Sequence, residues 1–394
     1  MSQNGGTVGT EYPDYTEHGR QYGSFGRGRY LFPVDELEKD RLDIFHHLIT
    51  KARGGLWEVP LPAKPHVLDL GTGTGIWAID VGDKLYVNED QRAQVLGLDL
   101  SLIQPKLIPT CVRFERADVE GPLPAPEQTF DLVHIQMLLG SIRDWPDLYR
   151  KSFRHIKPGG YIEQVEIEWI PRSDDNTIVP DSPLAVWGMN FRSAMHRYGQ
   201  PIDIIDTKKE LHAAGFTDIT EKMIRLPTNP WSQNPMEEEL GRWFNLGLTH
   251  CLEGLTLAPF IQVERWPKHD VDRLVDELKK DICRLNVHAY CRIVLIAGRR
   301  LPRVTSRLTG WEQTAGDFPA VTLPSHVHIQ NGMRQASNIR HLSPKQDISS
   351  GTSERFVFCT ITSRLLECQK YDLVALAPSC QQASVLAATH ATFR

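Results

Sequence analysis

The residues best suited to chemistry are three glycines at alternate positions, Gly71, Gly73 and Gly75, which follow the run VLDL. Glycine lets the backbone adopt a positive φ and approach a ligand closely. A strand, a glycine-rich turn and a helix form a nucleotide-binding crevice, in which the helix N-terminus favours a negative group. The spacing departs from the dinucleotide pattern, because Ile76 stands at its sixth position, and no Gly-Lys-Ser/Thr of a Walker loop follows.

Acidic residues accompany this turn. Asp69 precedes the glycines, Asp99 ends the apolar run QVLGLDL, and Asp118 ends the run VRFERAD. An acid at the end of the second strand can accept hydrogen bonds from the ribose of a nucleoside bound over the glycines. Each of two acids has an alternative role: Asp118 as a turn cap, and Asp69 as a support for the glycine turn that contacts no ligand.

Alternating strands and helices must position these residues, which implies βαβ units and a mostly parallel sheet. The sequence predicts strands at 66–71, 94–100, 112–119, 129–138, 161–169, 217–226 and 288–298. It predicts helices at 76–85, 146–156, 182–198, 207–214, 235–264 and 268–285.

The N-terminal part is expected to form an arm outside the sheet. Residues 1–19 show no periodicity and are expected to be disordered. A glycine- and aromatic-rich stretch follows, and beyond about Val34 a helix is predicted from the spacing of Leu37, Leu42, Phe45 and Leu48. The predicted domain spans 20–303, with its core at 64–170 and helical insertions at 182–264. Residues 304–394 are polar and turn-rich, which indicates a poorly structured tail.

Composition argues against several functions. The net charge of −5 is too small for strong attraction to nucleic acid or anionic membrane. No apolar stretch approaches the roughly 20 residues of a membrane helix, and the N-terminus has no secretory signal pattern. The seven cysteines include no C-x-x-C pair, which favours a reducing, intracellular location rather than secretion.

Five motifs together resemble class I S-adenosylmethionine-dependent methyltransferases: VLDLGTGTG, LGLDLS, RADVEG, FDLVHIQML and IKPGGYIEQVE. The resemblance implies a Rossmann-like, seven-stranded, mostly parallel sheet with inserted helices, and S-adenosylmethionine as cofactor. It places Asp99 on the ribose, Asp118 near the adenine amine and Gln136 near the transferred methyl group. The implied cofactor-binding residues are Tyr22, Tyr30, Asp69, Gly71, Gly73, Gly75, Asp99, Leu100, Asp118, Val119, Gln136 and Met137.

Three aromatic residues of the arm, Tyr22, Phe25 and Tyr30, allow two interpretations. They could form a lid over the sulfonium, since a ring face near a cation is worth about 0.5–2 kcal/mol. They could equally anchor the arm to the domain. Met137 likewise could contact the cofactor or only pack in the core.

The closer resemblance is to the fungal LaeA-like methyltransferases of the velvet complex. It is carried by GRQYGSFGRGRYLFPVDELEKDRLDIFH, by the core through IKPGGYIEQVEIEW, and by ICRLNVHAYCRI. It implies a nuclear regulator of secondary metabolism, development and sporulation that binds velvet-domain proteins and is also found in the cytoplasm. A small-molecule methyltransferase, and a scaffold that binds cofactor without turnover, remain alternatives. The methyl acceptor stays unknown, and no nucleic-acid motif is present.

No residue pattern identifies a catalytic group. Methyl transfer from a sulfonium is an in-line displacement, and a base is needed only if the acceptor carries a proton at attack. His134, Glu163, Glu166 and His250 are the candidates, none of them favoured.

Two further clusters are expected to be structural. Cys283, His288 and Cys291 lack a fourth zinc ligand, so no metal is predicted and buried thiols are expected. The basic run RKSFRHIK, at 150–157, is expected to be the solvated face of a helix.

Overall fold

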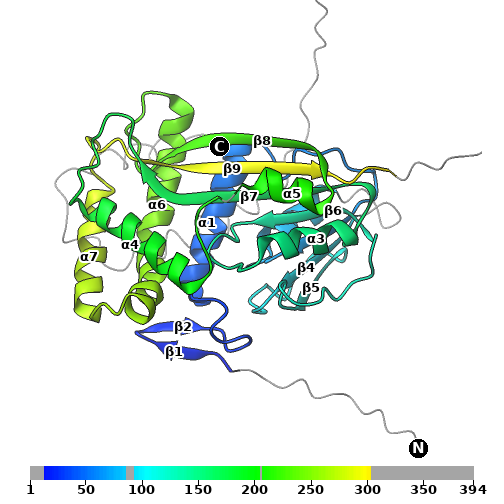
Figure 1. Cartoon of the computed structure of the whole chain (residues 1–394), viewed down its shortest axis with the longest axis horizontal. Coiled ribbons are helices and arrows are strands. Elements are labelled where there is room, and N and C mark those ends of the chain that lie inside the picture. Colours follow the sequence, from blue (N-terminus) through cyan, green and yellow to red (C-terminus); the bar gives the residue numbers. More distant parts are fainter. Residues whose placement is uncertain (1–12, 86–92, 205, 303–394) are drawn as a thin grey trace, which may run out of the picture. The chain divides into compact units, whose positions relative to one another are not determined.

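The structure is a computed structural model that describes residues 13–85, 93–204 and 206–302 (Figure 1). The predicted tail at 304–394 lies outside these residues, as do the first twelve positions of the N-terminal segment expected to be disordered. The described chain carries one large sheet, a two-stranded hairpin and a set of helices.

The large sheet has seven strands and a mostly parallel order. Across the sheet these are β5 (Val112–Arg116), β4 (Gln94–Asp99), β3 (His66–Leu70), β6 (Phe130–Gln136), β7 (Ile156–Arg172), β9 (Tyr290–Arg299) and β8 (Thr217–Pro227). Strands β5, β4, β3, β6 and β7 are parallel, whereas β9 runs antiparallel to both of its neighbours. The predicted fold class is confirmed. Because strand order reverses beside β3, the carboxyl ends of β3, β4 and β6 meet at the position where such sheets bind ligands.

The helices follow the predicted segments with small shifts at their ends. They are α1 (Glu36–Arg53), α2 (Ile76–Lys84), α3 (Trp145–His155), α4 (Pro183–Tyr198), α5 (Thr207–Ala214), α6 (Pro235–Ala258), the π-helical turn η2 (Pro259–Val263) and α7 (Lys268–Asp281). Side chains of Asp35 and Asp144 cap α1 and α3 by accepting hydrogen bonds from first-turn amides. None of the described helices is long and apolar enough to cross a membrane.

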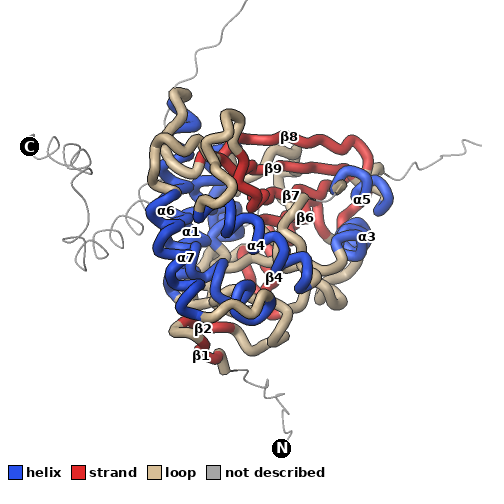
Figure 2. The backbone as a smooth tube through the Cα atoms, turned by 60° about the vertical axis from the view of Figure 1, so that its left-hand side comes forward, coloured by secondary structure: helices blue, strands red, loops and turns tan. Residues whose placement is uncertain are grey.

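Apolar clusters on the two faces of the sheet attach different helices. Helices α3 and α5 share one cluster with the sheet, whereas α1, α4, α6 and α7 share another with β7, β8 and β9. Figure 2 shows α1, α6 and α7 gathered together, apart from α3 and α5. A third cluster joins α2 to β3, β4 and β6. The glycine turn between β3 and α2 therefore lies between well-packed elements.

Order begins earlier in the chain than the periodicity indicates. Strands β1 (Tyr15–Glu17) and β2 (Arg20–Tyr22) pair as a hairpin, at the opposite end of α1 from β8 and β9 (Figure 1). The expectation of disorder up to residue 19 is therefore wrong for the hairpin. Arg20 explains the difference, because its buried guanidinium makes two hydrogen bonds, of 2.7 and 2.8 Å, to the α1 cap Asp35.

Two local predictions also differ from the structure. Leu37 is 47% exposed, whereas Phe45 and Leu48 of the predicted spacing are buried, together with Arg41. Strand β7 begins at Ile156, earlier than the predicted start at 161, and pairs irregularly with β6 at that end.

Candidate functional site

The glycine loop, residues 71–75, needs glycine for both conformation and space. Gly71, Gly73 and Gly75 have φ values of 70°, 56° and 77°. A Cβ atom on Gly71 would lie 2.3 Å from a methyl carbon of Leu138, far inside normal contact distance. The loop starts by donating two amide hydrogen bonds, from Gly71 and Thr72, to the carbonyl oxygen of Leu98. Its backbone therefore lies directly across the ends of β3 and β4.

Asp69 supports this loop from beneath. One carboxylate oxygen accepts a 2.6 Å hydrogen bond from the Thr72 hydroxyl, and the other lies 2.9 Å from Nδ1 of His134. His134 is fully buried and stacks on Trp77, with ring centroids 3.5 Å apart and planes 3° apart. The contacts of Asp69 are those expected of a supporting residue.

Asp99 joins the glycine loop to the end of β4. Its two carboxylate oxygens accept hydrogen bonds of 2.8 Å from the Gly73 amide and 2.9 Å from the Ser101 amide. Burial raises the pKa of Asp99, and the amide bonds oppose that effect. A carboxylate offers about four acceptor positions, so these amides leave acceptor capacity for a ligand.

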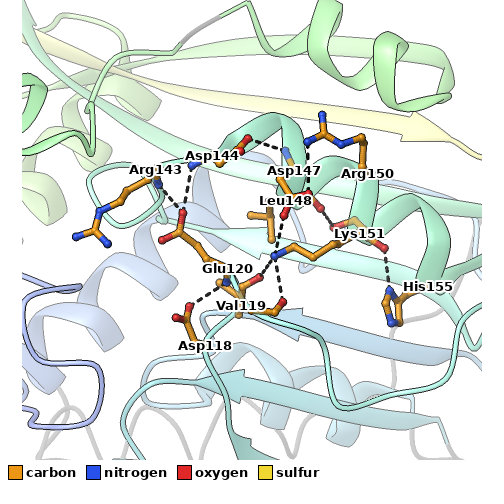
Figure 3. Close-up of polar contacts among 12 residues, drawn as sticks. Asp118, Val119, Glu120, Arg143, Asp144, Asp147, Leu148, Arg150, Lys151 and His155 are labelled. Carbon is orange, nitrogen blue, oxygen red and sulfur yellow. Dashed lines mark hydrogen bonds and ion pairs between the residues drawn. The ribbon is translucent and has the colours of Figure 1, made fainter.

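The acidic turn, residues 118–121, lies beyond β5 and is fixed from α3 (Figure 3). Lys151 donates to the carbonyl oxygens of Val119 and Gly121, at 2.8 and 3.1 Å. The Glu120 carboxylate accepts amide hydrogen bonds from Arg143 and Asp144, just before α3 begins. The turn therefore has a defined position without any glycine at positive φ.

Lys151 corrects the prediction for the basic run at 150–157. Its side chain is only 7% exposed, although Arg150 beside it is 52% exposed, as expected of a solvated face. Lysine is rarely buried unless its ammonium group is paired. Here the two turn carbonyls and Asp147, at 3.2 Å, provide the partners.

The N-terminal arm reaches the acidic turn. The guanidinium of Arg29 forms an ion pair with Asp118. The carbonyl of Gly28 accepts hydrogen bonds from Arg143 and Tyr198, and Gln200 donates a 2.6 Å bond to the carbonyl of Arg29. These contacts fix the arm beside the ends of β4 and β5.

The three arm aromatics separate into different environments. Tyr22 is buried in the hairpin and stacks on Tyr15 with ring centroids 5.5 Å apart, which is an anchoring position. Tyr30 is half-buried, packs edge-on against Phe32 and lines the cavity described below. Phe25 lies beneath the guanidinium of Arg116, 5.7 Å from ring centre to charge.

The end of β6 forms the third part of the site. Met137 has a φ of 58°, an uncommon value for a residue with a side chain, and its amide bonds to the carbonyl of Val165. The next two amides, of Leu138 and Leu139, donate to the carboxylate of Glu166 at 3.2 and 3.1 Å. Burial raises the pKa of Glu166 to about 7.

A cavity lies where these parts meet. Of the residues predicted to bind cofactor, it is lined by Tyr30, Gly71, Gly73, Asp99, Leu100, Asp118, Val119, Gln136 and Met137. Tyr22, Asp69 and Gly75 do not line it. Sequence reasoning missed Arg29 and Arg41, which line the cavity from the arm and α1. The only sequence signal for these two residues was that they are arginines, because neither belongs to a motif at the end of a strand.

None of the four base candidates is among the residues that line this cavity. Glu163 accepts a 2.6 Å hydrogen bond from Arg53 and a 2.9 Å bond from the Glu58 amide, all of them away from the cavity. His134 and Glu166 make the internal contacts given above. His250 lies on α6, where burial lowers its pKa.

The cysteine cluster differs in part from expectation. Cys291 is buried in β9, as predicted, but Cys283 is exposed because it follows the end of α7. His288 lies with Nδ1 2.5 Å from the carboxylate of Asp175. Among the described residues, no group of three or more potential ligands is arranged to hold a metal ion.

Comparison with known proteins agrees with this geometry. A methyltransferase domain family matches residues 44–221. The secondary metabolism regulator LAE1 of Cochliobolus heterostrophus is 45% identical over 309 residues, which cover 76% of this chain and 99% of that protein. The chain belongs to the LaeA/LAE1 family of methyltransferases.

Two other members of the family match a similar share of this chain. The secondary metabolism regulator laeA of Aspergillus flavus is 42% identical, over 71% of this chain and 75% of its own length. A relative in Emericella nidulans, named protein-methionine methyltransferase laeA, is also 42% identical, over 70% of this chain and 74% of its own. The predicted family, the enzyme class and the methyl donor of that class, S-adenosylmethionine, are confirmed.

Proposed function

We propose that the cavity binds S-adenosylmethionine across the ends of β5, β4, β3 and β6. The supporting observation is that residues predicted from separate motifs line one cavity. Asp99 keeps acceptor positions for the ribose hydroxyls, and the glycine loop presents backbone where a Cβ atom on Gly71 would clash. Asp118 and Val119 would face the adenine. Asp118 accepts from the Glu120 amide and Arg29, so an adenine amine would share it with the arm.

Bound S-adenosylmethionine supplies a methyl group on a sulfonium centre. The residues of this chain have to orient that centre and keep water away. Gln136 and Met137 line the cavity at the end of β6, and Tyr30 lines it from the arm. The ring of Tyr30 is suited to a cation, and its pKa is raised by burial, so it stays neutral at physiological pH.

We infer that the acceptor is a methionine side chain of a protein. A thioether attacks without losing a proton, so it needs no general base. The residues that line the cavity in the described chain include no histidine, lysine or cysteine, and the carboxylates among them, Asp99, Asp118 and Glu120, already accept hydrogen bonds from backbone amides. The name of the Emericella relative, a protein-methionine methyltransferase, supports the same acceptor class.

We further propose that the enzyme regulates secondary metabolism and development from the nucleus, in association with velvet-domain proteins. The family membership supports the regulatory role, since its members are named secondary metabolism regulators. The resemblance of the arm and core to the velvet-complex group supports the partner and the compartment. Affinity purification from nuclear extract with folded bait should recover velvet-domain proteins, and their absence would contradict this part.

The catalytic proposal is tested by binding and by transfer. Calorimetry should show S-adenosylmethionine binding to the full chain. Labelled methyl donor should then transfer label to methionine-containing peptides and not to matched peptides with norleucine. Label on an isolated metabolite instead would indicate a small-molecule enzyme, and binding without any transfer would indicate a scaffold. No binding at all would remove the cofactor proposal.

A further inference from the structure

Arg41 is a buried cation on the cavity wall whose hydrogen bonds are incomplete. It is 4% exposed and lies on α1, away from every strand-end motif. One guanidinium nitrogen pairs with Glu38, one turn earlier, but Nε has no hydrogen-bond partner among the described residues. Buried polar groups are nearly always satisfied, so an unsatisfied one on a cavity wall suggests a missing ligand.

The position of Arg41 relates it to one end of the cavity. It lines the cavity together with Gly71 and Gly73. Its neighbour Leu42 lies 3.4 Å from the position a Cβ atom of Gly73 would take, so α1 crosses directly over the glycine loop. The other cavity-lining arginine, Arg29, is paired with Asp118 beyond β5. Arg41 therefore lies at the end of the cavity next to the glycine loop after β3, and Arg29 lies at the opposite end, beyond β5.

The proposed function fixes which chemical group would reach Arg41. If Asp99 and Asp118 receive the nucleoside over β4 and β5, the amino-acid part of the donor extends over β3 and β6. That part ends in a carboxylate. A guanidinium presents a planar fork of donors that matches a carboxylate, and such charge-assisted bonds are the stronger kind.

We propose that Arg41 binds the α-carboxylate of the methyl donor, and that Glu38 and the ring of Phe45 position its guanidinium. The guanidinium carbon lies 5.2 Å from the centre of the Phe45 ring, and the Glu38 carboxylate is 2% exposed. Arg41 is thus a binding residue that the strand-end motifs do not include. The inference rests on the proposed cofactor site and adds the residue that selects the amino-acid end of the donor.

A ligand pair tests the assignment. S-adenosylhomocysteine carries the carboxylate, whereas 5′-methylthioadenosine has the same nucleoside and thioether without the amino acid. The parent should prefer S-adenosylhomocysteine, and replacing Arg41 should reduce that preference about ten- to hundredfold while binding of methylthioadenosine changes little. Calorimetry with both ligands measures the preference directly.

The variant has to avoid an unpaired buried charge. Arg41→Gln alone would leave Glu38 buried without a partner, which is strongly destabilising. The double variant Glu38→Gln/Arg41→Gln removes both charges. Its control is Glu36→Gln/Lys39→Gln, a pair with the same spacing on the same helix but with Glu36 73% exposed. The control should keep the full preference.

The outcomes separate the inference from the function it depends on. An unchanged preference in the folded double variant overturns the role of Arg41. If that variant does not fold, Arg41→Lys decides: it keeps the charge but loses the planar fork, so the preference should fall severalfold, and an unchanged preference again overturns the role. If the parent binds neither ligand, the cofactor site itself is wrong.

Discussion

The glycine loop and the acidic turn lie at the same edge of the sheet but are fixed by different means. The backbone of the glycine loop is hydrogen-bonded chiefly within its own and the neighbouring motif, to Leu98 and Asp99, although Thr74 also bonds to Asp43 of α1. The acidic turn is fixed by residues from distant elements, chiefly Lys151 in α3 and Arg29 in the arm. The conformation of the glycine loop depends mainly on its local backbone geometry, whereas the position of the acidic turn depends on tertiary contacts.

This difference explains which parts of the site a sequence reveals. A loop that needs positive φ must use glycine, so its requirement is visible as a motif. A turn supported by a lysine from another helix leaves no comparable pattern, because one lysine in a basic helix is indistinguishable from its solvated neighbours. The two regions should therefore respond differently to substitution.

The largest effect is expected at Gly71. Gly71→Ala adds a Cβ atom 2.3 Å from Leu138 at a φ of 70°, so overpacking is added to the strain of the left-handed conformation. The cost should be about 3 kcal/mol in the free energy of unfolding. The control is Gly199→Ala, at a φ of 84° with nothing within 4 Å, which should cost only about 1 kcal/mol. Equal costs by chemical denaturation would show that the loop is not tightly packed.

Asp99→Ala should give the next largest effect. The substitution removes the proposed ribose acceptor and also leaves the amides of Gly73 and Ser101 without their partner. Affinity for S-adenosylmethionine should fall about ten- to hundredfold. Asp99→Asn keeps one carbonyl acceptor and should lose less. Calorimetry on folded variants is the measurement, and parental affinity in Asp99→Ala would require another acid for the ribose.

The parallel core was predictable because local sequence patterns indicate the succession of its strands and helices. Short apolar runs alternate with amphipathic segments, and their boundaries came out within a few residues for most elements. The arm was less predictable: three-residue strands leave too short a pattern, and the hairpin depends on one buried arginine, Arg20, that pairs with a residue 15 positions later. Leu37 was misassigned because a leucine at approximately helical spacing does not by itself define the buried side.

The candidate site likewise contains residues that a motif predicts and residues that only the tertiary structure places there. Asp99 and the glycines belong to motifs, and they line the cavity apart from Gly75. Lys151 and Arg41 were missed because long charged side chains are exposed by default, and only tertiary structure shows where one is buried and paired. The family resemblance identified the motif residues as cofactor-binding, but it could not indicate which residue of α1 lines the cavity.

Lys151→Met tests the acidic turn with a smaller expected effect. The substitution keeps the apolar stem but removes the donor to the carbonyls of Val119 and Gly121. Stability should fall by about 1–3 kcal/mol, and affinity for S-adenosylhomocysteine about three- to tenfold, because the adenine side of the site loosens. The exposed neighbour provides the control: Arg150→Met should change stability by less than about 0.5 kcal/mol. Equal stability and equal affinity of the two variants would contradict the role of α3 in fixing the acidic turn.

The smallest effect concerns the loop Met137–Leu139, which a single titratable group fixes from within the sheet. The pKa of Glu166 is raised from 4.5 to about 7 by burial, so the folded protein keeps this proton at pH values where the unfolded chain has lost it. The free energy of unfolding therefore falls as pH rises through this window. Between about pH 6 and about pH 8 the loss from this group should be roughly 1.4 kcal/mol, because the folded protein holds the extra proton over about one pH unit of this window and each such unit is worth about that amount.

Glu166→Gln separates this contribution from other groups that titrate in the same range, such as the histidines. Its amide oxygen can still accept from Leu138 or Leu139, and it carries no charge to bury. Urea denaturation at both pH values should show the parent losing about 1.4 kcal/mol more than the variant. Parallel pH dependence of parent and variant would mean that Glu166 is ionised in the folded protein throughout. The loop at β6 would then be fixed by a permanent charge and not by a protonated acid.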